Sequence, residues 1–331
     1  MSTTLPPRAQ PTNRLSQLNH HFSTSSIKQE RNMASSDPQA HNNDEFKLDT
    51  LFNVKGKVAL ITGGATGIGL MATQALAVNG AKVYIVGRRE EKLDRVVETY
   101  NKGIAGEITA IQADVTNKDE IRKLYSEISK KEPHLDILIN NAGISTTTVE
   151  TEAKTAEEMK EKMFETDDAT FEDWDAVYRT NVSQCYFMST AFLPLLSKAS
   201  ESTPKWSSTI INISSISGQV KTAQHHPQYN ASKAATIHLT RMLANHVAEN
   251  GIKIRINSIA PGVFPSEMTA GDSNENSKSH IPKDKYADKV PAARPGNDRD
   301  MGATVLFVAS NQYLNGQIVT VDGGYTLAAG K

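Results

Sequence analysis

Short apolar runs alternate with amphipathic, helix-patterned segments along most of this chain. The runs have the length and β-branched content of buried strands, and they occupy residues 57–62, 82–86, 107–112, 136–140, 209–213, 253–259 and 317–321. Helical spacing fills the intervals, over residues 70–79, 90–101, 118–131, 171–196, 228–249 and 298–309. This alternation predicts βαβ units, in which parallel strands are covered by helices on both faces.

The predicted fold class is α/β, with a Rossmann-type, doubly wound sheet of seven parallel strands. The sequence has 331 residues, which is enough for one large α/β domain, and we assign residues 46–331 to it. Ligands of such sheets bind beyond the carboxyl ends of the strands. Functional residues are therefore expected just after each strand.

Two longer segments follow strands and are expected to border the site. Residues 144–170 contain a dense run of charges, which we interpret as a solvated helix rather than a substrate-contacting element. Residues 264–295 are polar with scattered Gly and Pro, which makes them a candidate lid.

Residues 1–45 differ in composition from the rest of the chain. They are rich in Ser, Thr, Asn, Gln, Pro and His and lack apolar periodicity, so a disordered amino-terminal extension is predicted. Within residues 1–29 there are three basic side chains and no acidic one, which is typical of a mitochondrial presequence, although weak helical amphipathicity counts against import. Plain disorder, or an extension upstream of a second start at Met33, remains open.

Charge and cysteine content narrow the partners and the compartment. The sequence holds 36 basic and 37 acidic side chains, a balance that gives no electrostatic support for binding nucleic acid or an anionic membrane. No stretch approaches the ~20 apolar residues of a transmembrane helix. The single cysteine, Cys185, cannot form an internal disulfide and favours a reducing compartment. The predicted location is the cytoplasm, or the mitochondrial matrix if residues 1–32 act as a presequence.

A glycine-rich turn, TGGATGIG, stands between the first predicted strand and the first predicted helix. Gly63 is expected to take the tight turn, Gly67 to let the backbone approach a pyrophosphate, and Gly69 to allow close helix–strand packing. The helix amino terminus offers free N–H groups and the positive end of its dipole to phosphates. This turn, which includes Thr66 and Ile68, is therefore predicted to bind a dinucleotide cofactor.

The second predicted strand ends on two arginines, Arg88 and Arg89. An NAD site usually has an acidic residue at this place for the ribose hydroxyls, and none stands here. A guanidinium can instead pair with the 2′-phosphate of NADP or stack on the adenine. NADP(H) is the predicted cofactor and NAD(H) the alternative, and Arg89 is expected to be the more solvent-facing arginine.

Two further turns are expected to complete the cofactor site. After the third strand, Asp114 and Val115 are placed to hold the edge of the adenine. After the fourth strand, a second group would let the backbone pass close to the ribose, and it consists of Asn141, Ala142 and Gly143.

The candidate catalytic residues begin with Tyr229 and Lys233, which lie four residues apart and share one helical face. A free phenol has a pKa near ~10, and the ammonium and the cofactor's charge are expected to lower it. Tyr229 can then donate a proton in reduction and accept one in oxidation. Ser215 is expected to hydrogen-bond the substrate oxygen. Asn181, a polar residue in an apolar helix, is expected to hold a water near Lys233.

Together these motifs resemble the short-chain dehydrogenase/reductases, over residues 51–327. The matching pieces, in the family's order, are TGGATGIG, DV, NNAG, the asparagine of RTNV, NISSISG, YNASK and APG. The resemblance implies a catalytic tetrad of Asn181, Ser215, Tyr229 and Lys233. It also implies that Tyr229 and Lys233 lie against the cofactor, with Lys233 on the nicotinamide ribose.

The resemblance extends to the turn after the sixth strand. It implies that Pro261 and Gly262, followed by Val263, lie by the nicotinamide, and that the loop beyond them covers substrate. It further implies a homodimer or homotetramer, paired through the helices that start near Phe171 and Gln228. The run PGVFPSEMT is similar to the rhamnolipid-type 3-oxoacyl-[acyl-carrier-protein] reductases.

One departure from the family concerns the cofactor. Many NADP-dependent members carry a basic residue where Thr66 stands. The NADP prediction therefore depends on Arg88 and Arg89 alone.

The predicted function is NADP(H)-dependent reduction of a ketone, with a 3-oxoacyl thioester among the candidates, to a secondary alcohol. A serine hydrolase does not fit, because the pattern G-x-S-x-G is missing around Ser215. No metal site is expected from His225, His226 and His238, because the first two are adjacent and diverge, and no Cys or carboxylate cluster supports them. The remaining alternative is a non-catalytic NADP-binding sensor or scaffold on the same fold.

Overall fold

The computed structural model of the chain describes residues 43–329. The predictions for residues 1–32 and for a start at Met33 lie outside the described residues, as does most of the predicted extension. The chain divides into two units, Met1–Lys47 and Leu48–Lys331. In the first, the described residues form the 3₁₀ turn η1 (Asn43–Phe46), followed by Lys47, whose ammonium pairs with Asp44 at 2.7 Å.

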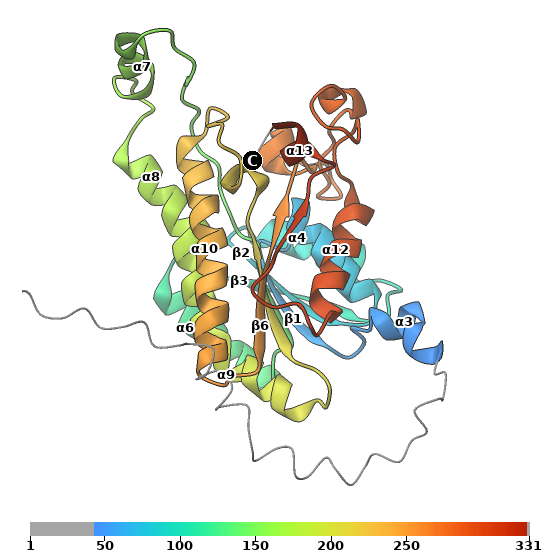
Figure 1. Cartoon of the computed structure of the whole chain (residues 1–331). Coiled ribbons are helices and arrows are strands. Elements are labelled where there is room, and N and C mark those ends of the chain that lie inside the picture. The colour runs from blue at the N-terminus through green and yellow to red at the C-terminus, as the bar shows by residue number, and fades with distance from the viewer. Residues whose placement is uncertain (1–42, 330–331) are drawn as a thin grey trace, which may run out of the picture. The chain divides into compact units, whose positions relative to one another are not determined.

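The second unit is built on a parallel sheet of seven strands, which confirms the predicted doubly wound α/β fold (Figure 1). The strand order is β3-β2-β1-β4-β5-β6-β7, so the winding reverses between β1 and β4. Each strand begins and ends within two residues of its predicted bounds. The strands are β1 (Val58–Thr62), β2 (Lys82–Gly87), β3 (Glu107–Gln112), β4 (Ile137–Asn140), β5 (Ser208–Ile213), β6 (Ile254–Pro261) and β7 (Ile318–Val321).

Helices cover both faces of the sheet, as Figure 1 shows for α4 and α12 on one side and α10 on the other. Alternate side chains of a strand point to opposite faces, so β1 contributes Ala59 and Ile61 to one core and Val58 and Leu60 to the other. The first face carries α4 (Gly67–Val78), α5 (Glu90–Tyr100) and α12 (Asp298–Ser310). The second carries α6 (Lys118–Lys131), α9 (Gln184–Ser202) and α10 (Pro227–Glu249). Among the helices of residues 43–329, none is long and apolar enough to cross a membrane.

The helix predicted over residues 171–196 is interrupted. The structure has α8 (Phe171–Tyr178), then a π-helical turn η2 (Arg179–Ser183), and then α9. Asn181 lies in this turn, and its side chain hydrogen-bonds the backbone of Ile144, in the segment after β4. Helical spacing alone could not predict the interruption, because the partner is 37 residues away in sequence.

The two predicted insertions differ in structure. The charged segment after β4 contains α7 (Ala156–Met163), which has no buried residue and matches the predicted solvated helix (Figure 1). The segment after β6 contains only the short turns α11 (Glu267–Ala270) and η4 (Lys283–Tyr286). The last described element is α13 (Tyr325–Ala329).

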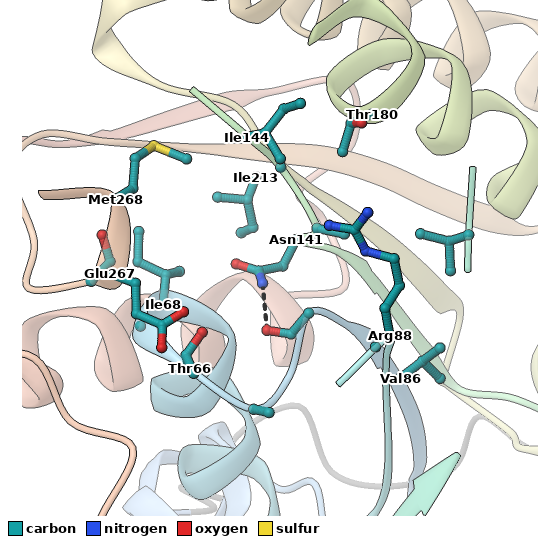
Figure 2. Close-up of a pocket in the computed structure, with 18 of the residues that line it drawn as sticks. Thr66, Ile68, Val86, Arg88, Asn141, Ile144, Thr180, Ile213, Glu267 and Met268 are labelled. Atoms are coloured by element: carbon teal, nitrogen blue, oxygen red, sulfur yellow. Dashed lines mark hydrogen bonds between the residues drawn. The ribbon is translucent and has the colours of Figure 1, made fainter. Parts of the chain in front are cut away.

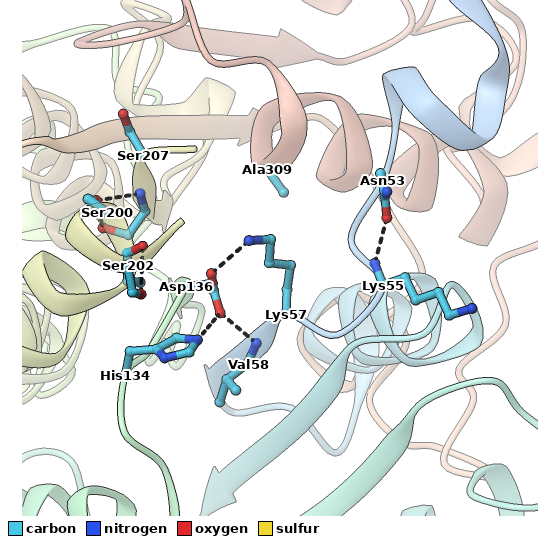
Figure 3. A network of polar contacts seen from close by, with 12 residues as sticks. Asn53, Lys55, Lys57, Val58, His134, Asp136, Ser200, Ser202, Ser207 and Ala309 are labelled. Carbon is cyan, nitrogen blue, oxygen red and sulfur yellow. Dashed lines mark hydrogen bonds and ion pairs between the residues drawn. The ribbon is translucent and has the colours of Figure 1, made fainter. Parts of the chain in front are cut away.

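A buried polar network closes the amino-terminal edge of the sheet (Figure 3). Asp136 is fully buried, accepts a hydrogen bond from the Val58 amide at 2.9 Å, and pairs with the Lys57 ammonium at 3.1 Å. His134 Nε2 lies 3.3 Å from the same carboxylate. The Lys57 ammonium also lies 4.1 Å from the ring centre of Trp206. The network therefore fastens the start of β1 to the start of β4, at the edge opposite the carboxyl ends.

Candidate active site

A cavity of about 420 Å³ lies at the carboxyl ends of the strands (Figure 2). Turns after six of the strands contribute to its wall, as expected for a doubly wound sheet. Most of the predicted site residues line it: Gly63, Thr66, Gly67, Ile68, Arg88, Arg89, Asp114, Val115, Asn141, Ala142, Gly143, Ser215, Tyr229, Lys233, Pro261 and Gly262.

Three predicted site residues do not line this cavity. A Cβ on Gly69 would lie 2.0 Å from the carbonyl oxygen of Gly63, so glycine lets the start of α4 lie close to the turn after β1. Asn181 lies behind the wall. The carbonyl of Val263 accepts a hydrogen bond from the Gly296 amide at 2.9 Å, so it fastens the segment after β6 instead.

The glycine-rich turn is held open by its neighbours. Gly63 and Gly67 have φ angles of +65° and +52°, which favour glycine. The Asn141 amide group donates to the carbonyls of Thr62 and Gly63 at 3.0 Å each, which fixes the turn against the end of β4. Thr66 caps α4 without a side-chain hydrogen bond, so the amides of the first helical turn face the cavity without an internal acceptor.

Thr62 is a supporting residue that the sequence analysis missed. Its hydroxyl accepts hydrogen bonds from the Asn141 and Ala142 amides, both at 3.0 Å. Register places the ends of β1 and β4 side by side, with Thr62 opposite Asn140. Thr62 could have been identified from the sequence, because it is a hydroxyl residue at the last position of a strand and directly precedes a glycine turn.

The turn after β3 is also stiffened locally. Asp114 Oδ1 accepts hydrogen bonds from the Thr116 amide and hydroxyl, at 2.9 and 2.7 Å. The Asp114 amide in turn donates to Glu120. Asp114 and the buried Val115 therefore present a fixed edge to the cavity.

The end of the cavity beyond β2 carries three cations, Arg88, Arg89 and Lys92. Lys92 was not predicted, although its position three residues after Arg89 at the start of α5 places the two on one face. A carboxylate, Glu267 of α11, pairs with two of them, Arg89 at 2.6 Å and Lys92 at 3.3 Å. Figure 2 shows Glu267 and Arg88 on opposite sides of the cavity.

The other end of the cavity brings together Ser215, Tyr229 and Lys233. Ser215 ends the turn after β5 and caps the 3₁₀ turn η3 (Ile216–Gly218). A Cβ on Gly218 would lie 2.5 Å from the backbone of α10, so glycine lets η3 approach that helix and the residues it carries. The Lys233 ammonium donates to the carbonyl of Ile213 at 3.0 Å and lies 5.5 Å from the ring centre of Tyr229.

The electrostatics of this end differ from the prediction. Burial lowers the pKa of Lys233 to about 8. Burial also raises the pKa of Tyr229, and a side-chain hydrogen bond with Ser215 only partly opposes it. The predicted lowering of the Tyr229 pKa by the ammonium is therefore wrong for the protein alone, because desolvation of the phenolate outweighs the other influences.

Asn181 supports the catalytic end through hydrogen bonds. Its Oδ1 accepts from the Ile144 amide, and its Nδ2 donates to the Ile144 carbonyl and to Ser232 Oγ, all within 3.0 Å. Ile144 lines the cavity and Ser232 precedes Lys233 on α10. Asn181 thus joins the turn after β4 to the helix that carries Tyr229. The water predicted near it stays a prediction.

The histidines before α10 lie beside the segment after β4. His226 Nδ1 is 3.4 Å from Ser145 Oγ, and His225 Nδ1 is 3.6 Å from Glu150 Oε1. Over residues 43–329, no group of three or more His, Cys, Asp or Glu side chains could hold a metal ion.

The chain is similar to known proteins in both sequence and structure. The short chain dehydrogenase family matches residues 57–277. The short-chain dehydrogenase/reductase PhomF of Diaporthe leptostromiformis is 38% identical over 279 residues, covering 83% of this chain and 92% of that protein. The rhamnolipids biosynthesis 3-oxoacyl-[acyl-carrier-protein] reductase of Pseudomonas aeruginosa is 32% identical over 282 residues, covering 83% and 98%. The solved structure of the Pseudomonas aeruginosa RhlG/NADP active-site complex superimposes with a TM-score of 0.68 at 30% identity, covering 83% and 98%.

Proposed function

The chain belongs to the short chain dehydrogenase family and is an oxidoreductase, and we propose that it reduces a ketone to a secondary alcohol with NADP(H). One observation carries the proposal: Ser215, Tyr229 and Lys233 lie at one end of a cavity that also holds a glycine-rich turn and a cluster of cations. A general acid and a dinucleotide cradle in one cavity are the two parts that such a reaction needs.

The residues of the cavity fit an NADP molecule. A Cβ on Gly67 would lie 2.8 Å from the Cβ of Ser266, so glycine lets the segment after β6 lie close to this turn, which would bind the pyrophosphate. Arg88 and its neighbouring cations would hold the 2′-phosphate. Asp114 and Val115 would hold the adenine, and Gly143 would adjoin the ribose. The similarity to the solved complex of RhlG with NADP supports the same cofactor.

The proposed mechanism assigns proton transfer to this chain's own side chains. When bound, the nicotinamide supplies the hydride that reduces the carbonyl carbon. Ser215 Oγ hydrogen-bonds the carbonyl oxygen, and Tyr229 Oη donates a proton to it. Because burial raises the Tyr229 pKa, the phenol stays protonated at neutral pH, which is the form that reduction requires. Lys233, with its pKa lowered to about 8, returns a proton to the site through solvent.

The substrate class we propose is an aliphatic ketone, and a 3-oxoacyl thioester is the first to test. The rhamnolipids relative carries that substrate in its name. Figure 2 shows Ile144 and Met268 at the upper side of the cavity, so apolar side chains contribute to this part of its wall.

A panel of carbonyl compounds tests the proposal, with NADPH consumption followed by absorbance. It should include 3-oxoacyl thioesters of acyl carrier protein and coenzyme A, cyclic ketones and keto sugars. We expect turnover with at least one ketone. Failure of the whole panel, with NADPH still bound, would favour a non-catalytic sensor or scaffold on the same fold.

For assembly, we propose a homodimer or homotetramer that pairs through α8, α9 and α10. Large apolar side chains exposed on these helices support the proposal, because aromatic residues are enriched at protein interfaces. They are Phe171, Trp174, Tyr186, Phe187 and Met242. Light scattering tests it, and a monomer would contradict it.

For the chain as a whole, we propose a catalytic domain over residues 46–331 and an extension over residues 1–45. We propose the cytoplasm as the compartment, because the one cysteine of the sequence, Cys185, is a buried free thiol. Amino-terminal sequencing of the mature protein distinguishes an intact chain, a start at Met33 and a cleaved presequence.

A further inference from the structure

Glu267 is a carboxylate that pairs with two of the three cations proposed above to hold the cofactor's 2′-phosphate. Its Oε2 pairs with Arg89 Nη2 at 2.6 Å. Its Oε1 lies 3.3 Å from the Lys92 ammonium and accepts a hydrogen bond from Ser273 Oγ at 2.8 Å. The glutamate therefore occupies two of the three cations at this end of the cavity.

The surroundings keep this carboxylate charged and in place. Partial burial by itself raises the pKa of Glu267, but hydrogen bonds from Arg89 and Ser273 outweigh it and hold that pKa below its ordinary value. The Lys92 ammonium also donates to Ser273 Oγ at 2.9 Å, which closes a ring of contacts. The side chains of Glu267 and Lys92 are only 22% and 18% exposed, so water screens their pairing less than it would a surface pair.

Arg88 differs from the other two cations. Within residues 43–329, no carboxylate pairs with its guanidinium, and it lies across the cavity from Glu267 (Figure 2). Arg88 can take up a phosphate without losing a partner. Arg89 and Lys92 must first exchange a carboxylate for it, and a phosphate close to a retained carboxylate would be repelled.

We propose that Glu267 is a specificity-determining residue that competes with the cofactor's 2′-phosphate for Arg89 and Lys92, and so limits the preference for NADP(H) over NAD(H). This inference rests on the proposed function, since it concerns the same cofactor site. It predicts that neutralising Glu267 strengthens binding of a 2′-phosphorylated ligand and leaves binding of its unphosphorylated counterpart unchanged.

Two adenosine nucleotides that differ only in the 2′-phosphate test the proposal. Adenosine 2′,5′-bisphosphate and adenosine 5′-monophosphate are titrated by calorimetry into the full chain and into Glu267→Gln, which keeps the side-chain shape. We expect the bisphosphate to bind about five-fold tighter to the variant, the scale of a partly screened ion pair, and the monophosphate to bind equally. Glu275→Gln is the control, because Glu275 is an exposed carboxylate of the same segment, and it should change neither affinity.

The possible results separate this inference from the assignment of NADP(H). The role of Glu267 would be overturned if Glu267→Gln left the ratio of bisphosphate affinity to monophosphate affinity unchanged or made it smaller. An equal gain in bisphosphate affinity in Glu275→Gln would overturn it as well. The ratio in the unaltered chain tests the cofactor assignment by itself. If that chain prefers the monophosphate while Glu267→Gln gains the bisphosphate, the inference stands and the NADP(H) assignment fails.

Discussion

Replacing Arg88 by alanine should remove the strongest contact to the 2′-phosphate. Arg88 lines the cavity, and among the described residues no carboxylate competes for its guanidinium. Arg88 and Arg89 are both exposed, but Arg89 is paired with Glu267. The two neighbouring arginines should therefore contribute unequally to cofactor selection.

The size of the effect follows from this difference. A hydrogen bond to a charged group contributes about 1.5–3 kcal/mol, so Arg88→Ala should weaken NADPH binding roughly 10- to 150-fold. NADH lacks the 2′-phosphate and so loses no ion pair in this variant. Its affinity should therefore stay within about two-fold, which is within the small contribution of an exposed charge. Arg89→Ala should cost less NADPH affinity, since Arg89 must first release Glu267.

The assay is a titration of NADPH and of NADH, followed by fluorescence of the reduced nicotinamide. Arg95→Ala is the matched control, because Arg95 is an exposed arginine of the same helix, α5. Equal losses for NADPH and NADH in Arg88→Ala, or a larger NADPH loss in Arg89→Ala, would refute the assignment of Arg88 to the phosphate.

Two further predictions concern stability. The Lys233 pKa is lowered from 10.5 to about 8, so between these pH values the unfolded chain binds more protons and stability rises with pH. Urea unfolding should therefore show the unaltered chain gaining stability over Lys233→Met from pH 8 to 10, and a constant difference would contradict this. Asp136→Ala should lower the free energy of unfolding by about 3 kcal/mol, the low end for a buried pair because the Lys57 side chain keeps some water contact. The NADPH affinity of the folded Asp136→Ala variant should not change, because this network lies at the edge of the sheet opposite the cavity. A loss of NADPH affinity in the folded variant would contradict the independence of the two edges.

The sheet was predictable because burial on both faces leaves a local trace. β1 (VALIT), β2 (KVYIVG) and β4 (ILIN) are mostly apolar runs beside turn residues, and the helices that separate the strands carry their own spacing. The glycine turn and the pair Tyr229 and Lys233 were predictable for the same reason, since their partners are a few residues away. These parts of the site lie where the sequence placed them relative to the strands.

The remainder of the site depends on contacts between distant segments. Glu267 and Arg89 are 178 residues apart, and no periodicity relates them. Asn181, in the π-helical turn, likewise hydrogen-bonds Ile144, which lies 37 residues away in the sequence. In the protein alone, burial raises the Tyr229 pKa, and the sequence motif could not show this because it indicates a neighbouring charge but not the degree of burial.

The most direct test of the proposed chemistry is Tyr229→Phe, compared with Tyr313→Phe, a tyrosine that is 100% exposed. NADPH affinity and single-turnover reduction of an accepted ketone are measured on both variants. We expect Tyr229→Phe to bind NADPH as the unaltered chain does and to lose about 10²–10⁴-fold in the reduction rate, the usual contribution of a general acid. Tyr313→Phe should change neither quantity. Near-normal reduction by Tyr229→Phe would contradict the role of this phenol as the proton donor.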